Sequence, residues 1–80
     1  MLIKFKDLVE IETFCQLAEQ YDGDVIVTNG SIAIDGESVV GIVAMGANKW
    51  LELHIAEEYT QAAKDFKIAI RQMGIKTKGE

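Results

Sequence analysis

The sequence predicts a single α+β domain, residues 1–80, in which helices cover one face of an antiparallel sheet. Three observations support this prediction. Short stretches of alternating apolar residues, typical of half-buried strands, recur along the chain, and segments with helical apolar spacing separate them. Glycine alone punctuates these segments, because the chain has no proline. The predicted order of elements is β-α-β-β-α-β-α.

The first quarter of the chain predicts a strand followed by a helix. Residues 2–5 place Ile3 and Phe5 on one face of a strand. We expect Asp7 to cap a helix that ends near residues 21–23, with Glu10 completing a capping-box pattern three residues later. The predicted buried positions of this helix are Ile11, Phe14, Cys15, Ala18 and Tyr21.

A β-hairpin is predicted next. Residues 24–28 alternate, and residues 31–35 alternate in the same way. Between them, Asn29-Gly30 is a dipeptide that tolerates the positive φ of a two-residue turn. We expect Ile32 and Ile34 to be buried on the second strand.

The second half of the chain predicts a helix, a strand and a helix. A short helix over 38–45 should end at Gly46. The strand over 50–55 has the clearest alternation and places His54 on the open face of the sheet, with no second His or Cys near it in sequence to form a metal site. A final helix over 60–73 has a predicted buried stripe of Ala62, Phe66, Ala69, Ile70 and Met73.

Composition narrows the classes of partner and compartment. Thirteen acidic against eight basic residues give a formal net charge of -5, which repels a phosphate backbone and predicts no nucleic-acid partner. The basic residues near the end, Lys76 and Lys78 with Arg71, are too few to reverse this expectation. A lone cysteine, the absence of a signal-peptide pattern and the absence of a membrane-spanning apolar run predict a soluble cytoplasmic protein with no membrane partner.

One segment resembles a known family. Ser38-Val-Val-Gly-Ile-Val-Ala-Met-Gly46 is similar to the Ser-Ile-Met-Gly segment that opens the second helix of HPr, the histidine-containing phosphocarrier of the bacterial sugar phosphotransferase system. Tyr21-Asp22-Gly23-Asp24-Val25 and residues 47–55 also resemble the family, in the right order, so the resemblance covers roughly residues 8–73. It implies an open-faced β-sandwich, with a four-stranded antiparallel sheet and helices on one face.

The resemblance fails at the phosphate-carrying position. The family has a Gly-hydrophobic-His-Ala-Arg-Pro stretch, whose histidine caps the first helix, whereas Asp7 stands at that cap here. Val9 and Glu10 fall where the arginine and proline should be. Relay of phosphate needs an imidazole nucleophile and a cation beside the added charge. We therefore expect a protein that is not an enzyme, carries no phosphate on histidine, and needs neither cofactor nor metal.

The resemblance also implies a regulatory site and a partner surface. Ser38 matches the serine that a dedicated kinase phosphorylates in many Gram-positive bacteria, although the acidic Asp35 and Glu37 would oppose a phosphate, so a plain helix cap stays open. In the family, the second helix docks on partner proteins. The expected partner surface consists of Val39, Val40, Val43 and Met45, and the expected partners are phosphotransferase-system components or a transcription regulator.

Two alternatives remain open at this stage. One is a genuine phosphocarrier that uses an unusual acceptor, Asp7 or His54. The other is a ferredoxin-like ligand-sensing or RNA-binding domain, which predicts a different strand order and, for RNA, paired aromatic residues on the sheet, where Trp50 is the one clear candidate.

Overall fold

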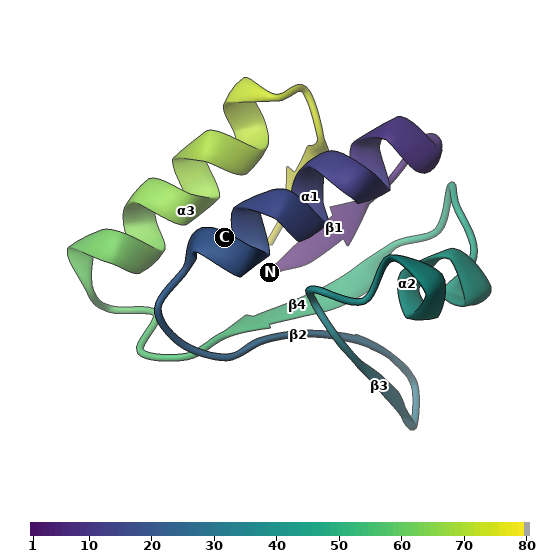
Figure 1. The fold of residues 1–80 in the computed structure, drawn as a ribbon, viewed down its shortest axis with the longest axis horizontal. Helices are drawn as coiled ribbons and strands as arrows, with labels where there is room; N and C mark the ends of the chain where they lie inside the picture. The colour runs from purple at the N-terminus through teal and green to yellow at the C-terminus, as the bar shows by residue number, and fades with distance from the viewer. Residues whose placement is uncertain (80) are drawn as a thin grey trace.

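The computed structural model describes residues 1–79 and has α+β architecture, as predicted (Figure 1). Within these residues the helices are α1 (Leu8–Gln20), α2 (Val39–Met45) and α3 (Gln61–Gln72). The strands are β1 (Leu2–Lys4), β2 (Val25–Asn29), β3 (Ile32–Asp35), β4 (Leu51–Ile55) and β5 (Lys76–Lys78). None of the described helices is both long and apolar enough to cross a membrane.

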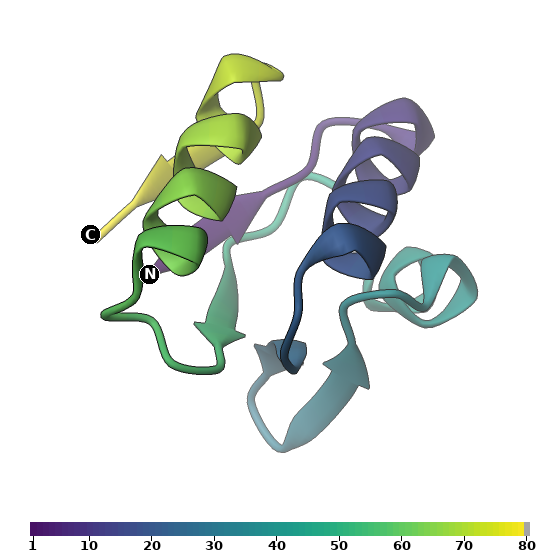
Figure 2. The same ribbon diagram turned by 60° about the vertical axis from the view of Figure 1, so that its left-hand side comes forward.

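The strands form one antiparallel sheet in the order β3-β2-β4-β1-β5. The helices lie on one side of this sheet and leave its other face open (Figures 1 and 2). The predicted number of four strands is wrong, because Lys76–Lys78 adds a fifth beside β1. Its sequence, Lys-Thr-Lys, contains no apolar alternation, so only pairing with β1 reveals it as a strand. Lysines on an edge strand also discourage pairing with another chain.

The register of the β2–β3 hairpin differs by two residues from the predicted one. Asn29 pairs with Ile32, so the two-residue loop is Gly30-Ser31 rather than Asn29-Gly30. Gly30 supplies the positive φ, 62°, that the turn needs. A shift of two residues keeps every side chain on its face. It moves Ile32 past the end of the core, however, and leaves this residue 56% exposed instead of buried as predicted.

Each helix begins at a side-chain cap. Asp7, Ser38 and Thr60 accept hydrogen bonds from the backbone N–H three residues later, at 3.0, 3.1 and 3.2 Å. These bonds satisfy amides that have no partner inside the helix, and each contributes about 1 kcal/mol. The caps expected at Asp7 and Ser38 are therefore confirmed, and α2 ends at Gly46, where φ is 100°.

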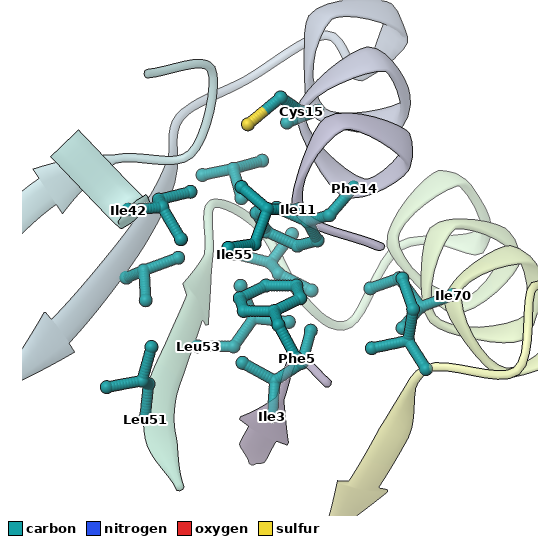
Figure 3. Close-up of a cluster of buried hydrophobic side chains, with 14 of the residues drawn as sticks. Ile3, Phe5, Ile11, Phe14, Cys15, Ile42, Leu51, Leu53, Ile55 and Ile70 are labelled. Atoms are coloured by element: carbon teal, nitrogen blue, oxygen red, sulfur yellow. The ribbon is translucent and has the colours of Figure 1, made fainter. Parts of the chain in front are cut away.

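The core lies between the helices and the covered face of the sheet (Figure 3). Three aromatic rings join Phe5, the residue after β1, to α1 and α3. Phe14 contacts Phe5 edge-on at 5.2 Å between centroids and Phe66 at 6.0 Å. Buried aliphatic residues fill the remaining space; the largest are Ile3, Ile11, Ile42, Leu51 and Ile70.

The buried stripe of α3 differs from the predicted one. It consists of Ala63, Phe66, Lys67 and Ile70, whereas Ala62 and Met73 are exposed. The prediction was wrong because Lys67, a charged residue, occupies one of the buried positions, so the apolar spacing did not indicate the buried face of the helix. Its apolar stem lies in the interface while its Nζ reaches the Glu58 carboxylate at 3.8 Å.

Candidate functional site

The start of α1 carries the residue that replaces the carrier histidine in the resemblance. The Asp7 carboxylate accepts the Glu10 N–H through Oδ1 at 3.0 Å. The buried Glu10 carboxylate in turn accepts the Lys6 N–H at 2.9 Å. Asp7 therefore acts in this structure as a helix cap, and Glu10 fixes the chain just before it.

His54 lies on the open face of the sheet, as the alternation of β4 predicts. Its Nε2 is 3.2 Å from Oε2 of Glu52 and 3.3 Å from Oγ1 of Thr28. Because α1 covers the other face, the histidine and Asp7 are on opposite sides of the sheet and form no common site. No group of three or more His, Cys, Asp or Glu side chains within residues 1–79 is placed to hold a metal ion.

Ser38 begins α2 in a tightly packed corner. Its Oγ accepts the Gly41 N–H at 3.1 Å, and its own N–H donates to the Asp35 carbonyl at 3.0 Å. A Cβ on Gly41 would lie 2.5 Å from Cγ2 of Ile34 and 2.9 Å from the Ser38 Oγ. Gly41 therefore lets α2 approach β3 closely, and Ser38 remains half-buried at the rim.

The expected partner surface is only partly exposed. Val40 is 82% and Val43 46% exposed, and Val39 is half-buried. Met45 is 6% exposed and belongs to the core, so its assignment to the surface was wrong. The reason is helical geometry, because Met45 stands three residues after the fully buried Ile42 and faces the same way.

An apolar groove, which the sequence analysis missed, lies beside the exposed valines. It has a volume of about 330 Å³ between α2 and the hairpin. Its lining residues are Asn29, Ile32, Ile34, Gly41, Ala44, Met45 and Lys49. The exposure of Ile32, produced by the hairpin register, was the missing element. The valines and this groove together make the α2 region an exposed apolar surface.

A second cavity, also missed, lies at the opposite edge of the sheet. It has a volume of about 210 Å³ and is lined by Lys4, Lys6, Glu10, Asn48, Gly74 and Lys76. Asn48 adopts a positive φ of 61°, and its N–H donates to the Phe5 carbonyl at 2.6 Å, which fixes the loop at this end of β1. Lys76 of β5 lines this cavity because β5 pairs with β1, a pairing that the sequence pattern does not reveal.

Cys15 is buried inside α1 and is chemically suppressed. Burial, reinforced by the negative charges of Glu19 and Asp35, raises the pKa of its thiol to about 11. A thiol with this pKa is almost entirely protonated near neutral pH, so Cys15 is not a nucleophile.

The comparisons with known proteins do not assign the chain. No family model, no curated protein and no solved structure matches it. The functional argument therefore depends on the residues and their arrangement.

Proposed function

We propose that the chain is an HPr-like regulatory and interaction module, related to the sugar phosphotransferase system, that docks on proteins through α2 and carries no phosphate on histidine. The observation that carries the proposal is that the capping position of α1 and the single histidine lie apart. The carboxylate of Asp7 caps α1, where the resemblance calls for an imidazole, and the single histidine lies on the open face of the sheet.

The chemistry at Asp7 disfavours a phosphate carrier. One of its oxygens is held by the Glu10 N–H, and Glu10 adds a second carboxylate one turn into the helix. The nearby cavity is lined by three lysines and by Glu10, and Asp7 is not among its lining residues. An acyl phosphate at Asp7 would therefore form without a cation placed against the added charge.

Docking through α2 is supported by the exposed apolar surface described above. A 7-residue helix whose Val40 and Val43 project into solvent gains free energy when a partner covers them, about 25 cal/mol per Å² of apolar area. Phosphotransferase-system components and a transcription regulator are the partners that the resemblance implies.

Ser38 is the regulatory residue of this proposal. A phosphate on its Oγ would replace the hydroxyl hydrogen and make this oxygen a poorer acceptor for the Gly41 N–H, and it would place about two negative charges beside the valines of α2. Phosphorylation would thereby alter the charge of the docking surface without requiring a change of fold.

The decisive experiment is intact-mass analysis after two separate incubations. With phosphoenolpyruvate and purified enzyme I, we expect no gain of a phosphate. With ATP and purified HPr kinase, we expect one phosphate on the wild type and on Ser31→Ala, and none on Ser38→Ala. Ser31 is the matched control, because it is the other serine in the chain.

Two outcomes would count against the proposal. A phosphate gained from phosphoenolpyruvate would establish a carrier, and Asp7→Ala and His54→Ala variants would then locate the acceptor. No gain from ATP would remove the switch and leave docking alone.

Docking is tested by titrating purified enzyme I and HPr kinase with variants. We expect Val40→Asp to weaken binding by about tenfold or more, because it places a charge at the centre of an apolar contact. Ile68→Asp is the control, since Ile68 is also an exposed aliphatic residue, at 46% against 82% for Val40, but lies on α3. Equal losses in both variants would show that α2 is not the docking surface.

A further inference from the structure

The β1–β5 edge gathers positive charge in a protein that is acidic overall. Lys4 on β1 pairs directly with Lys76 on β5, and Leu2 pairs with Lys78. Lys6 lies two residues after the end of β1, so four of the eight basic residues lie at this one edge. Within residues 1–79, none of these four ammonium groups lies within 4.0 Å of a carboxylate oxygen.

This arrangement costs stability in the absence of a ligand. Side chains directly opposite each other on antiparallel strands have Cβ atoms about 5 Å apart, and like charges there repel. The Lys4–Lys76 pair therefore opposes the pairing of β5 with β1. An anion between the two ammonium groups would turn this repulsion into attraction.

The cavity at the end of this edge is suited to a small anion. Lys4, Lys6 and Lys76 line it together with one acidic residue, Glu10. The Glu10 carboxylate is already engaged by the Lys6 N–H. The volume of about 210 Å³ is below the roughly 300 Å³ at which pockets for whole drug-sized molecules begin, so it matches a phosphate group better than a complete ligand.

An aromatic platform adjoins the cavity. Lys4 is one of the residues that line the cavity; its ammonium lies 5.2 Å from the centre of the Trp50 ring, and that of Lys78 lies 4.3 Å from it. Trp50 is half-buried and stands just before β4. Flat rings stack on indoles, so a base that displaces the Lys78 ammonium from the ring would leave this charge beside the attached phosphate.

We propose that this edge, defined by Lys4, Lys6, Lys76, Lys78 and Trp50, binds a nucleotide, with its phosphate among the lysines and its base against Trp50. The net charge of -5 does not forbid this, because salt screens exposed charges beyond about 8 Å at physiological ionic strength. The site lies at the opposite edge of the sheet from β3 and is independent of the docking proposal.

The intrinsic fluorescence of Trp50 tests the proposal directly, since it is the one tryptophan in the chain. At physiological ionic strength, we expect saturable quenching of this fluorescence by ATP. Adenosine lacks the phosphate and tripolyphosphate lacks the ring, so each should bind about tenfold more weakly, with tripolyphosphate binding measured by calorimetry. A short oligoadenylate tests whether the nucleotide is free or part of a single strand. Tighter binding of the oligoadenylate than of AMP identifies a single strand, and equal binding identifies a free nucleotide. Both results support the site.

Matched variants separate the site from overall charge. Lys76→Gln should weaken ATP binding by about tenfold and, without ligand, raise the unfolding midpoint because it relieves repulsion with Lys4. Lys64→Gln removes the same charge from an exposed position on α3 and should leave binding within about twofold. Circular dichroism verifies that both variants are folded.

Three results would overturn the proposal: absence of saturable quenching, tripolyphosphate binding as tightly as ATP, or equal weakening by Lys64→Gln and Lys76→Gln. The first would remove the site. The second would remove the role of Trp50, and the third would reduce the effect to net charge.

Discussion

The two edges of the sheet present different chemistry on a shared core. At the β3 edge, the exposed surface is carbon, with Val40, Val43 and Ile32 around an apolar groove. At the β5 edge it is positive charge, with lysines around a polar cavity and over Trp50. The loop after α2 contributes to both, since Lys49 lines the groove and Asn48 the cavity. This small domain thus presents two different surface chemistries on one core.

The edges also differ in what fixes them. The β3 edge depends on close packing, because Gly41 lets α2 approach Ile34. The β5 edge depends on three paired residues and includes a repulsive lysine pair. The apolar edge is therefore held by side-chain packing, whereas the basic edge is the part that the proposed ligand would stabilise.

The largest expected effect comes from breaking the support common to both edges. Phe14→Ala removes a fully buried ring that contacts Phe5 and Phe66, and we expect a loss of about 3–5 kcal/mol in the free energy of unfolding. Urea unfolding followed by circular dichroism and by Trp50 fluorescence should show both signals shifting together. Val9→Ala, exposed on the same helix, should stay within about 0.5 kcal/mol. Separate shifts of the two signals would mean that the edges unfold independently.

The second effect is alkaline destabilisation through Cys15. Its pKa is raised to about 11 in the folded state, so the unfolded thiol loses its proton at lower pH than the folded one. Stability is therefore complete below about pH 9 and falls as pH rises towards 11, by about 2–3 kcal/mol in total. Urea midpoints across this range should decline less in Cys15→Ala. Parallel declines in the two proteins would contradict the assignment to this thiol.

A third, intermediate effect compares the caps on either side of the core. Asp7→Ala and Ser38→Ala should each lower the free energy of unfolding by about 1 kcal/mol, because each leaves a helix amide without its acceptor. Asp7→Ser keeps an acceptor at the same position and should recover most of this loss in thermal unfolding. A serine variant as unstable as the alanine variant would show that the carboxylate has a role other than capping.

The smallest effect on stability is expected at the apolar edge. Val40→Ser replaces a side chain that is already mostly in water, so the free energy of unfolding should change by less than about 0.5 kcal/mol. Ile42→Val, two residues on but fully buried, should cost about 0.5–1.5 kcal/mol. A larger loss at Val40 than at Ile42 would reverse the assignment of the inward and outward faces of α2.

The sequence was informative where local chemistry decides the structure. Asp7 and Ser38 have acceptor side chains at the right spacing from free amides, and the alternation of β4 places His54 outward whatever the surroundings. Long-range contacts were beyond its reach. Lys76–Lys78 becomes a strand through its pairing with β1, and Lys67 is buried on α3 with its ammonium group 3.8 Å from the carboxylate of Glu58, a residue outside that helix.

The candidate sites followed the same division. Val40 and Val43 were predicted to be exposed, since a short apolar helix cannot bury every side. The groove was not predicted because it depends on how α2 packs against the hairpin, and the basic cavity was not predicted because it combines residues from both ends of the chain. Met45 is buried although it was predicted to be exposed, and Ile32 is exposed although it was predicted to be buried. Packing decides both, through the orientation of α2 and the register of the hairpin.

The antiparallel pairing of β1 with β5 has a mechanical consequence. Leu2 lies opposite Lys78, so a tether at each end of the described chain would pull at the same corner of the sheet. The load would fall on one residue pair at a time and peel β5 away in sequence instead of shearing all its hydrogen bonds at once. Under tension, β5 should detach at low force while the rest of the sheet is still intact.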